Sequence, residues 1–242
     1  MKALFFLILF CVFLLPAKAQ EKASTPNLVV MLGGAVYFNE GSSVIKMANH
    51  LQEKFPNDSI QYIPAHFFIG GHTKRKTLCH IKAFKAKHPE SKLILYGYSI
   101  GADYLLKLQR KLYKQDITVD LFVSVDAVGR RARYIRENVK QQLNLYQETS
   151  KEEFWGYGFN AWLHGRPNTS SATTKLINVN IESVDLNQFV PKKYEVVAHK
   201  NLKDVTEAFV LWYLSDYLSG GTRNTANEDW LQLVIDTYNG DL

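Results

Sequence analysis

The stretch "KLILYGYSIGADYLLKL" (residues 92–108) holds Ser99 at the centre of a glycine frame, G-Y-S-I-G at 97–101. The apolar run before the frame predicts a buried strand, and the spacing of the leucines after it predicts a helix. A serine on a sharp turn between a strand and a helix is exposed at the edge of a sheet, where it can act as a nucleophile. The flanking glycines avoid the crowding that larger side chains would cause in such a turn. The surroundings of Ser99 therefore favour a catalytic nucleophile over a plain turn.

Residues 1–19 have the features of a secretory signal peptide. Lys2 supplies a positive start, residues 3–15 form an apolar run, and A-K-A at 17–19 fits a cleavage site near Ala19. The apolar run is shorter than a membrane-spanning helix requires. We therefore expect a cleaved signal and a secreted or periplasmic protein, with a retained N-terminal anchor as the alternative.

Residues 20–242 are enough for a single domain with a substantial core. The formal net charge of the whole chain is +6, and the lysines are spread along the sequence. The densest basic run, "HTKRK" at 72–76, lacks the interleaved aromatic residues of a nucleic-acid platform and predicts a solvated helix start. Cys79 is the only cysteine after the signal, which excludes an intramolecular disulfide and a cysteine-based zinc site. We expect no nucleic-acid partner, no metal and no other cofactor.

Apolar runs typical of buried strands alternate with segments of helical spacing along the chain. Strands that are apolar on both faces are typical of a parallel sheet with helices on both sides. The sequence therefore predicts an α/β fold with a mainly parallel central sheet. The stretch 27–38 is expected to hold a buried strand that enters a tight loop at Gly33 and Gly34. The other expected strands cover 59–65, 92–99, 118–128, 141–147, 175–183 and a short run leading up to His199, and the expected helices cover 42–55, 73–87, 101 onward, 200–218 and 228–238.

A serine nucleophile needs a base, and the base needs a carboxylate that orients it. On this architecture the three residues follow one another along the chain as serine, acid and histidine. Only His164 and His199 lie after Ser99. His199 is preceded by a short apolar run and followed by a helix, which is a rigid place for an imidazole, whereas His164 sits in a loop-like stretch. We expect His199 to be the base.

Three carboxylates between the serine and His199 are candidates for the acid. Asp126 ends a predicted strand, at the carboxyl edge where α/β proteins build their sites. Asp185 and Glu182 follow a later strand, but they lie in the connection that already delivers the histidine. We therefore favour Asp126 over Asp185, and both over Glu182.

An oxyanion hole is expected to take one N–H group from the helix start and one from the loop after the first strand. The N–H of Ile100 lies at the predicted helix N-terminus, whose positive dipole end favours developing negative charge. In "LGGAVYF" (32–38), Gly33 and Gly34 let the backbone approach a substrate closely. We expect Ile100 and Gly34 to donate to the oxyanion, with Ala35 as the alternative to Gly34.

Together these residues resemble the α/β-hydrolase superfamily in its lipase-like and esterase-like branches. The resemblance is carried by "LGGAVYFNEG" as the oxyanion loop, "LILYGYSIGAD" as the elbow, "LFVSVDAV" as the acid strand and "VVAHKNL" as the histidine loop. It implies a three-layer sandwich and a triad of Ser99, Asp126 and His199 that works without a metal. Many members of the superfamily carry their acid after a later strand, which is the place of Asp185.

Residues 154–174 combine clustered aromatic side chains with glycines. Such a loop is typical of a mobile apolar flap over an acyl or lipid pocket, and it would also serve for contact with a membrane surface. The alternative is a long loop whose aromatic residues pack onto the body of the domain.

The sequence thus predicts a serine hydrolase that cleaves a carboxylic ester or a thioester through an acyl-enzyme intermediate. Its substrate would be a lipid ester or a small-molecule acyl ester. Two alternatives use the same residues differently. A non-catalytic hydrolase-like protein would only bind a partner, whereas an acyltransferase or peptidase would use the same triad on another acceptor or bond.

Overall fold

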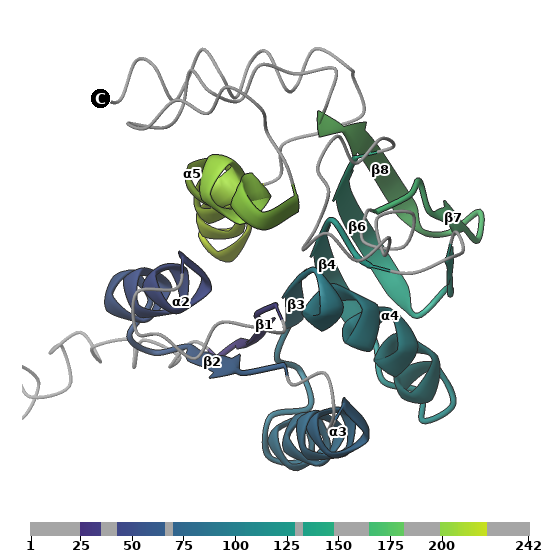
Figure 1. Cartoon of the computed structure of the whole chain (residues 1–242). Helices are drawn as coiled ribbons and strands as arrows, with labels where there is room; N and C mark the ends of the chain where they lie inside the picture. The colour runs from purple at the N-terminus through teal and green to yellow at the C-terminus, as the bar shows by residue number, and fades with distance from the viewer. Residues whose placement is uncertain are drawn as a thin grey trace, which may run out of the picture.

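The central sheet consists, in the part of the chain that the structure describes, of six parallel strands (Figure 1). The computed structural model describes residues 25–34, 43–65, 70–128, 133–147, 165–181 and 199–221. Every neighbouring pair of strands in this sheet is parallel. From one edge to the other the strands are β2 (Ser59–Ile63), β1 (Leu28–Leu32), β3 (Leu93–Tyr98), β4 (Val119–Val125), β6 (Val139–Tyr146) and β8 (Lys175–Asn180).

Strands β1, β3 and β4 are buried along their whole length. A strand with helices on both sides has no face in water, so both faces of its pleat must be apolar. This is why their sequences, LVVML, LILYGY and VDLFVSV, contain few polar residues. Strand β8 lies at the edge of the sheet, where it is only partly buried and carries Lys175, Asn178 and Asn180.

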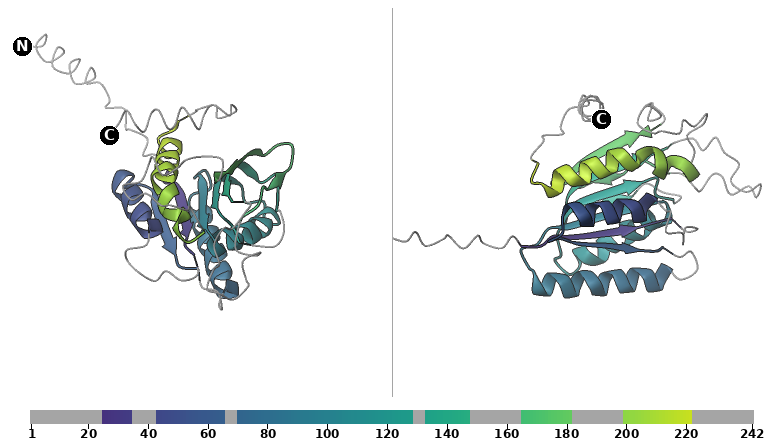
Figure 2. Two further views of the ribbon diagram at one scale, coloured as in Figure 1. Left: turned by 45° about the horizontal axis from the view of Figure 1, so that its top comes forward. Right: turned by 90° about the vertical axis from the view of Figure 1, so that its left-hand side faces the viewer.

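Helices cover both faces of the sheet. α2 (Ser43–Lys54) and α5 (His199–Leu218) lie on one face, and α3 (Gly70–Lys87) and α4 (Ile100–Tyr113) lie on the other (Figure 1). Figure 2 shows these layers from the side. The predicted three-layer α/β sandwich with a parallel central sheet is therefore confirmed.

Each central strand contributes to two hydrophobic cores, because successive side chains of a strand point to opposite faces. In β1, Val29 and Met31 pack with the buried residues of α2 and α5, whereas Leu28 and Val30 pack with those of α4. Burying a side chain of this size stabilises the fold by about 1.5–3 kcal/mol. The two cores therefore hold both helix layers firmly against the sheet.

A small second sheet pairs β5 (Tyr134–Ile135) with β7 (Thr169–Ser170) in parallel. Ile135 is buried in the same core as α4, and the carbonyl of Tyr134 accepts a hydrogen bond of 3.2 Å from Nε2 of Gln109 in that helix. Strands of two residues have no hydrophobic period, so the sequence does not predict them. The small sheet attaches the chain before β6 and the chain before β8 to the body of the domain.

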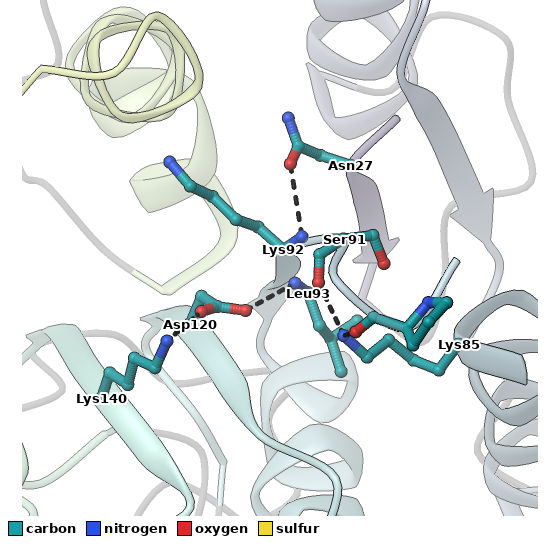
Figure 3. A network of polar contacts seen from close by, with 8 residues as sticks. Asn27, Lys85, Ser91, Lys92, Leu93, Asp120 and Lys140 are labelled. Carbon is teal, nitrogen blue, oxygen red and sulfur yellow. Dashed lines mark hydrogen bonds and ion pairs between the residues drawn. The ribbon is translucent and has the colours of Figure 1, made fainter. Parts of the chain in front are cut away.

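Polar contacts join the strands at their amino-terminal ends (Figure 3). Asp120 in β4 accepts a hydrogen bond of 2.8 Å from the backbone N–H of Leu93 in β3, and its other oxygen accepts one of 2.7 Å from Nζ of Lys140 in β6. Asn27, just before β1, accepts a hydrogen bond of 3.3 Å from the N–H of Lys92. Asp120 is therefore a structural carboxylate that links three neighbouring strands.

Some element boundaries agree with those that the sequence predicts, and others differ. β1 ends at Leu32, directly before the two glycines at which the strand was predicted to enter a tight loop. α3 begins at Gly70 instead of 73, and α5 begins at His199 itself instead of 200. The strands and helices predicted within the described residues are otherwise present in the predicted order.

Other predictions concern segments outside the described residues. These are the signal peptide at 1–19, the short run before His199 and the helix at 228–238. Among the residues that are described, no helix is both long enough and apolar enough to cross a membrane.

Candidate active site

Ser99 lies on the turn between β3 and α4 in an unusual backbone conformation. Its φ is 56° and its ψ is −122°, so a residue with a side chain occupies a region that normally favours glycine. Backbone hydrogen bonds hold the turn on both sides. The N–H of Ser99 donates to the carbonyl of Val125 at 2.9 Å, and the carbonyl of Ser99 accepts from the N–H groups of Asp103 at 3.1 Å and Val128 at 3.4 Å. Strain of this kind persists only where the surroundings enforce it, and it is concentrated at functional sites.

The two glycines of the frame are required because backbone segments cross there at close range. A Cβ atom on Gly97 would lie 2.6 Å from Cα of Ala102, in the first turn of α4. A Cβ atom on Gly101 would lie 2.5 Å from the carbonyl oxygens of Leu32 and Gly33, at the end of β1. Both distances are too short for any side chain. The crowding predicted around the serine is therefore present, and it comes from backbone atoms that have little freedom to move.

Replacing Gly101 by alanine should destabilise the protein strongly. The new methyl group would push two backbone carbonyls apart, and we expect Gly101→Ala to lower the free energy of unfolding by about 1–3 kcal/mol or to prevent folding. Gly71 in α3 is the matched control, because a Cβ atom there would meet nothing within 4 Å. Gly71→Ala should raise the free energy of unfolding by up to about 1 kcal/mol. Urea denaturation measures the free energy of unfolding of both variants. Equal changes in the two would contradict the close backbone approach at Gly101.

The structure brings Gly34 and Ile100, the two predicted oxyanion donors, next to Ser99. Ile100 is the first residue of α4, and a Cβ atom on Gly34 would lie 3.5 Å from Cβ of Ser99. The backbone after β1 thus passes directly beside the serine. Ala35, the alternative donor, lies outside the described residues.

Asp126 follows β4 at the same edge of the sheet. Val125, the residue before it, accepts the hydrogen bond from the N–H of Ser99, so the serine and the aspartate stand on neighbouring strands at nearly the same height. Asp126 is fully buried, and its backbone φ of 44° is also in the left-handed region. Its Oδ1 accepts hydrogen bonds from the backbone N–H groups of Gly165 and of Gln147, the latter at 3.3 Å. These donors replace the water that a buried carboxylate has lost.

The backbone of Gly165 approaches the carboxylate as closely as it can. A Cβ atom on Gly165 would lie 2.8 Å from Oδ1 of Asp126 and 2.9 Å from Cβ of Tyr146. No other residue type would fit, so this glycine is part of the environment of Asp126. Gly165 is not among the residues predicted from the sequence.

A line of hydrogen-bonded side chains holds the segment that carries Gly165. Ser124, Asn144 and Asn178 face one another at matching positions of β4, β6 and β8, and we call these three residues the polar ladder. Oγ of Ser124 donates to Oδ1 of Asn144 at 2.8 Å, and Nδ2 of Asn144 donates to Oδ1 of Asn178 at 2.9 Å. Nδ2 of Asn144 also donates to the carbonyl of Arg166 at 2.8 Å.

Asn178, the member of the polar ladder in β8, also binds the segment that carries Gly165. Asn178 accepts a hydrogen bond of 2.9 Å from the N–H of Asn168 and donates one of 3.0 Å to its carbonyl. Residues 165–168 are therefore fixed along the sheet, and the N–H of Gly165 is fixed against Asp126. The signal in the sequence was a polar residue in the second half of each of three buried or half-buried strands.

Removing the amide of Asn144 should be costly, because its partners lie in the buried part of the sheet. We expect Asn144→Ala to lower the free energy of unfolding by about 2–4 kcal/mol, since the hydroxyl of Ser124 and the carbonyl of Arg166 would each lose a hydrogen bond. Asn49→Ala on the exposed side of α2 is the control and should change stability by less than about 0.5 kcal/mol. Chemical denaturation of the two variants would refute the role of the ladder if Asn144→Ala proved equally mild.

His199 is the first residue of α5. The start of this helix lies at the edge where the strands have their carboxyl ends, as the side view in Figure 2 shows. This is the edge that carries Ser99 and Asp126. The other candidates, His164, Glu182 and Asp185, lie outside the described residues. The described residues hold no group of three or more histidine, cysteine, aspartate or glutamate side chains that could bind a metal ion.

The predicted lid, 154–174, falls into two parts. Residues 165–174 belong to the body of the domain, because they include the segment held by the polar ladder and strand β7. The aromatic part, 154–164, lies outside the described residues.

No protein-family model matches the sequence, and no curated protein matches it. Solved structures do match. A cutinase-like protein from Cryptococcus sp. has a TM-score of 0.46 and 10% identity, covering 83% of this chain and 96% of that chain. A structure described as a YdeN-like hydrolase from Pectobacterium atrosepticum has a TM-score of 0.44 and 11% identity, covering 80% and 91%.

A third match is the thioesterase domain that cyclises the lipopeptide antibiotic surfactin. Its TM-score is 0.40 at 13% identity, with 79% of this chain and 93% of that chain covered. At these identities and TM-scores the three matches carry no argument, and the candidate site rests on the geometry around Ser99.

Proposed function

We propose that this protein is a serine hydrolase that cleaves a carboxylic ester or thioester through an acyl-enzyme. The observation that carries the proposal is the backbone of Ser99, which is held in the left-handed region on a strand-to-helix turn. Two glycines make this turn sterically feasible, and the backbone of Gly34 lies beside it. A turn that only reverses the chain would be built at lower cost from glycine at position 99.

Each residue of the proposed site has one role in the reaction. Oγ of Ser99 attacks the carbonyl carbon and gives its proton to the imidazole of His199, while the N–H groups of Ile100 and Gly34 hold the oxygen that becomes negative. The imidazolium returns the proton to the leaving alcohol or thiol as the bond to the carbonyl carbon breaks. Water, activated by the same imidazole, then releases the acid and restores the serine. Asp126 orients the imidazole and stabilises its charge.

The burial of Asp126 supports its choice as the acid. It lies one residue beyond the strand that binds the N–H of Ser99, and backbone donors hold one of its oxygens in place. A carboxylate fixed in this way can hold an imidazole at a defined angle. Asp185 and Glu182 are the alternatives.

The substrate class rests on the sequence. The aromatic residues of 154–164 are the candidate cover for an acyl chain, which favours lipid or other apolar acyl esters. The signal-like segment 1–19 favours an exported enzyme, with cleavage near Ala19. A series of p-nitrophenyl esters of increasing chain length would define the preferred acyl group.

A fluorophosphonate probe should label Ser99 in the folded protein. The probe reacts only with an activated serine, and mass spectrometry of the digested protein locates the adduct. Ser99→Ala should abolish labelling, and heat-denatured protein should not react. A native protein that binds apolar esters but gives neither labelling nor turnover would be a non-catalytic binding protein, contrary to the proposal.

The role of Asp126 can be separated from its structural contribution by comparison with Asp120. Both are buried aspartates of the β4 region that accept backbone N–H donors, but they lie at opposite ends of the strand. Asp126→Asn should reduce the rate of labelling or ester hydrolysis on the order of 10³–10⁴-fold. Asp120→Asn should lower stability by about 1–3 kcal/mol and leave the rate of the folded protein unchanged. A loss below about tenfold for Asp126→Asn would move the acid to Asp185 or Glu182.

A further inference from the structure

Positive charge is concentrated on one face of the sandwich. α3 carries five lysines, one arginine and no acidic residue, and α4 carries two lysines, one arginine and one aspartate, so the two helices together have a formal charge of +8. α2 and α5, on the opposite face, carry equal numbers of lysines and acidic residues and have no net charge. The formal charge of the whole chain is +6, so one helix layer holds more than the entire surplus.

The cations of this layer lie on its outer surface. In α4 every exposed residue is cationic: Lys107, Arg110 and Lys111, which are spaced to share one side of the helix, and Lys114 continues the row just after it. The other residues of α4 are buried or half-buried. We call the exposed cations of the two helices, together with Lys114, the basic face: Arg75, Lys76, Lys82, Lys87, Lys107, Arg110, Lys111 and Lys114.

Within α3 and α4 little negative charge compensates the basic face, and the nearby exposed carboxylates, Asp116 and Glu137, lie at the C-terminal end of α4. Asp103, the one acidic residue of the two helices, is buried and pairs with Lys107 and with Arg133. None of the other cations of the basic face forms a salt bridge within the described part of the chain. Burial lowers the pKa of Lys74 in α3, and the charges of Lys107 and Lys111 in α4 lower it further, while Asp103 acts in the opposite direction.

We propose that the basic face binds the surface of an anionic phospholipid bilayer. α3 and α4 lie side by side on the outside of the sheet (Figure 1), and an 18-residue helix is about 27 Å long. The cations are therefore spread over a broad surface, which matches a plane of lipid phosphates better than it matches a single small anion. Each lysine or arginine near an anionic membrane contributes a favourable term that falls off within a Debye length.

The surroundings of the basic face favour a lipid surface over a single-stranded nucleic acid. Single-stranded nucleic acids are held by aromatic side chains on which bases stack. Among the described residues the one large hydrophobic side chain with high exposure is Tyr134, at 42%, and it lies in β5 outside both helices. The contact would be electrostatic and reversible, with no side chain of the described residues to insert into the bilayer.

The inference does not depend on hydrolase activity, so its test uses binding alone. The chain from residue 20 onward is sedimented with two kinds of phosphatidylcholine vesicles, one with about one-third phosphatidylglycerol and one without it, each at low and high salt. We expect binding only to the anionic vesicles, and its loss at high salt. Arg110→Gln combined with Lys111→Gln should reduce the partition coefficient roughly 25-fold, since each cation removed costs about fivefold. Glutamine is a good helix former, so α4 should remain intact.

The control removes the same charge from the other face. Lys46 and Lys54 are exposed on α2, and Lys46→Gln combined with Lys54→Gln should leave vesicle binding within about twofold of the wild type. Equal losses in the two double variants would mean that net charge alone acts, and would overturn the proposal. So would an absence of binding to anionic vesicles, or tighter binding to double-stranded DNA than to vesicles at the same salt concentration.

Discussion

The contact between the first turn of α4 and the ends of β1 and β3 determines how the site is built. Gly97 and Gly101 allow backbone atoms to approach to distances that no side chain would permit. Because helix and strands are packed this tightly, the residue between them has no room to adopt an ordinary conformation. Ser99 is pushed into the left-handed region, and its N–H is tied to the neighbouring strand β4. The strain is offset by the hydrophobic core that packs α4 against the sheet.

A second constraint acts on the other half of the sheet, where polar groups are buried. Ser124 and Asn144 are almost completely inaccessible, and an unsatisfied amide there would be costly. Their hydrogen bonds run from strand to strand and end on the backbone of 165–168. A network of this kind fixes geometry more than it adds stability. Here the network fixes the position of the backbone N–H of Gly165, which donates a hydrogen bond to the carboxylate of Asp126.

The sequence predicted the layers and the sharp turn at Ser99, and physical reasons explain what it did not predict. Continuous apolar runs identify buried strands, and the glycine frame identifies the turn at Ser99. The polar ladder escaped prediction because it depends on register: Asn144 faces Ser124 and Asn178 only in the folded sheet. Gly165 escaped because its neighbour in space, Asp126, is distant in sequence. The start of α5 was misplaced by one residue, since helix ends are set by capping and packing that periodicity does not report.

α4 connects the site to the basic face, and its buried and exposed sides differ in the substitutions that they tolerate. Its buried side must fit β1 and β3, so it tolerates little change. Its exposed side contributes nothing to that fit, and like charges three and four residues apart destabilise a helix by about 0.2–0.5 kcal/mol per pair. Lys107 offsets part of this through Asp103, but Arg110 and Lys111 have no such partner within the described residues. A sequence arranged for stability alone would place glutamates among these cations. The row of like charges is a cost to the folded protein, and an anionic surface would remove it.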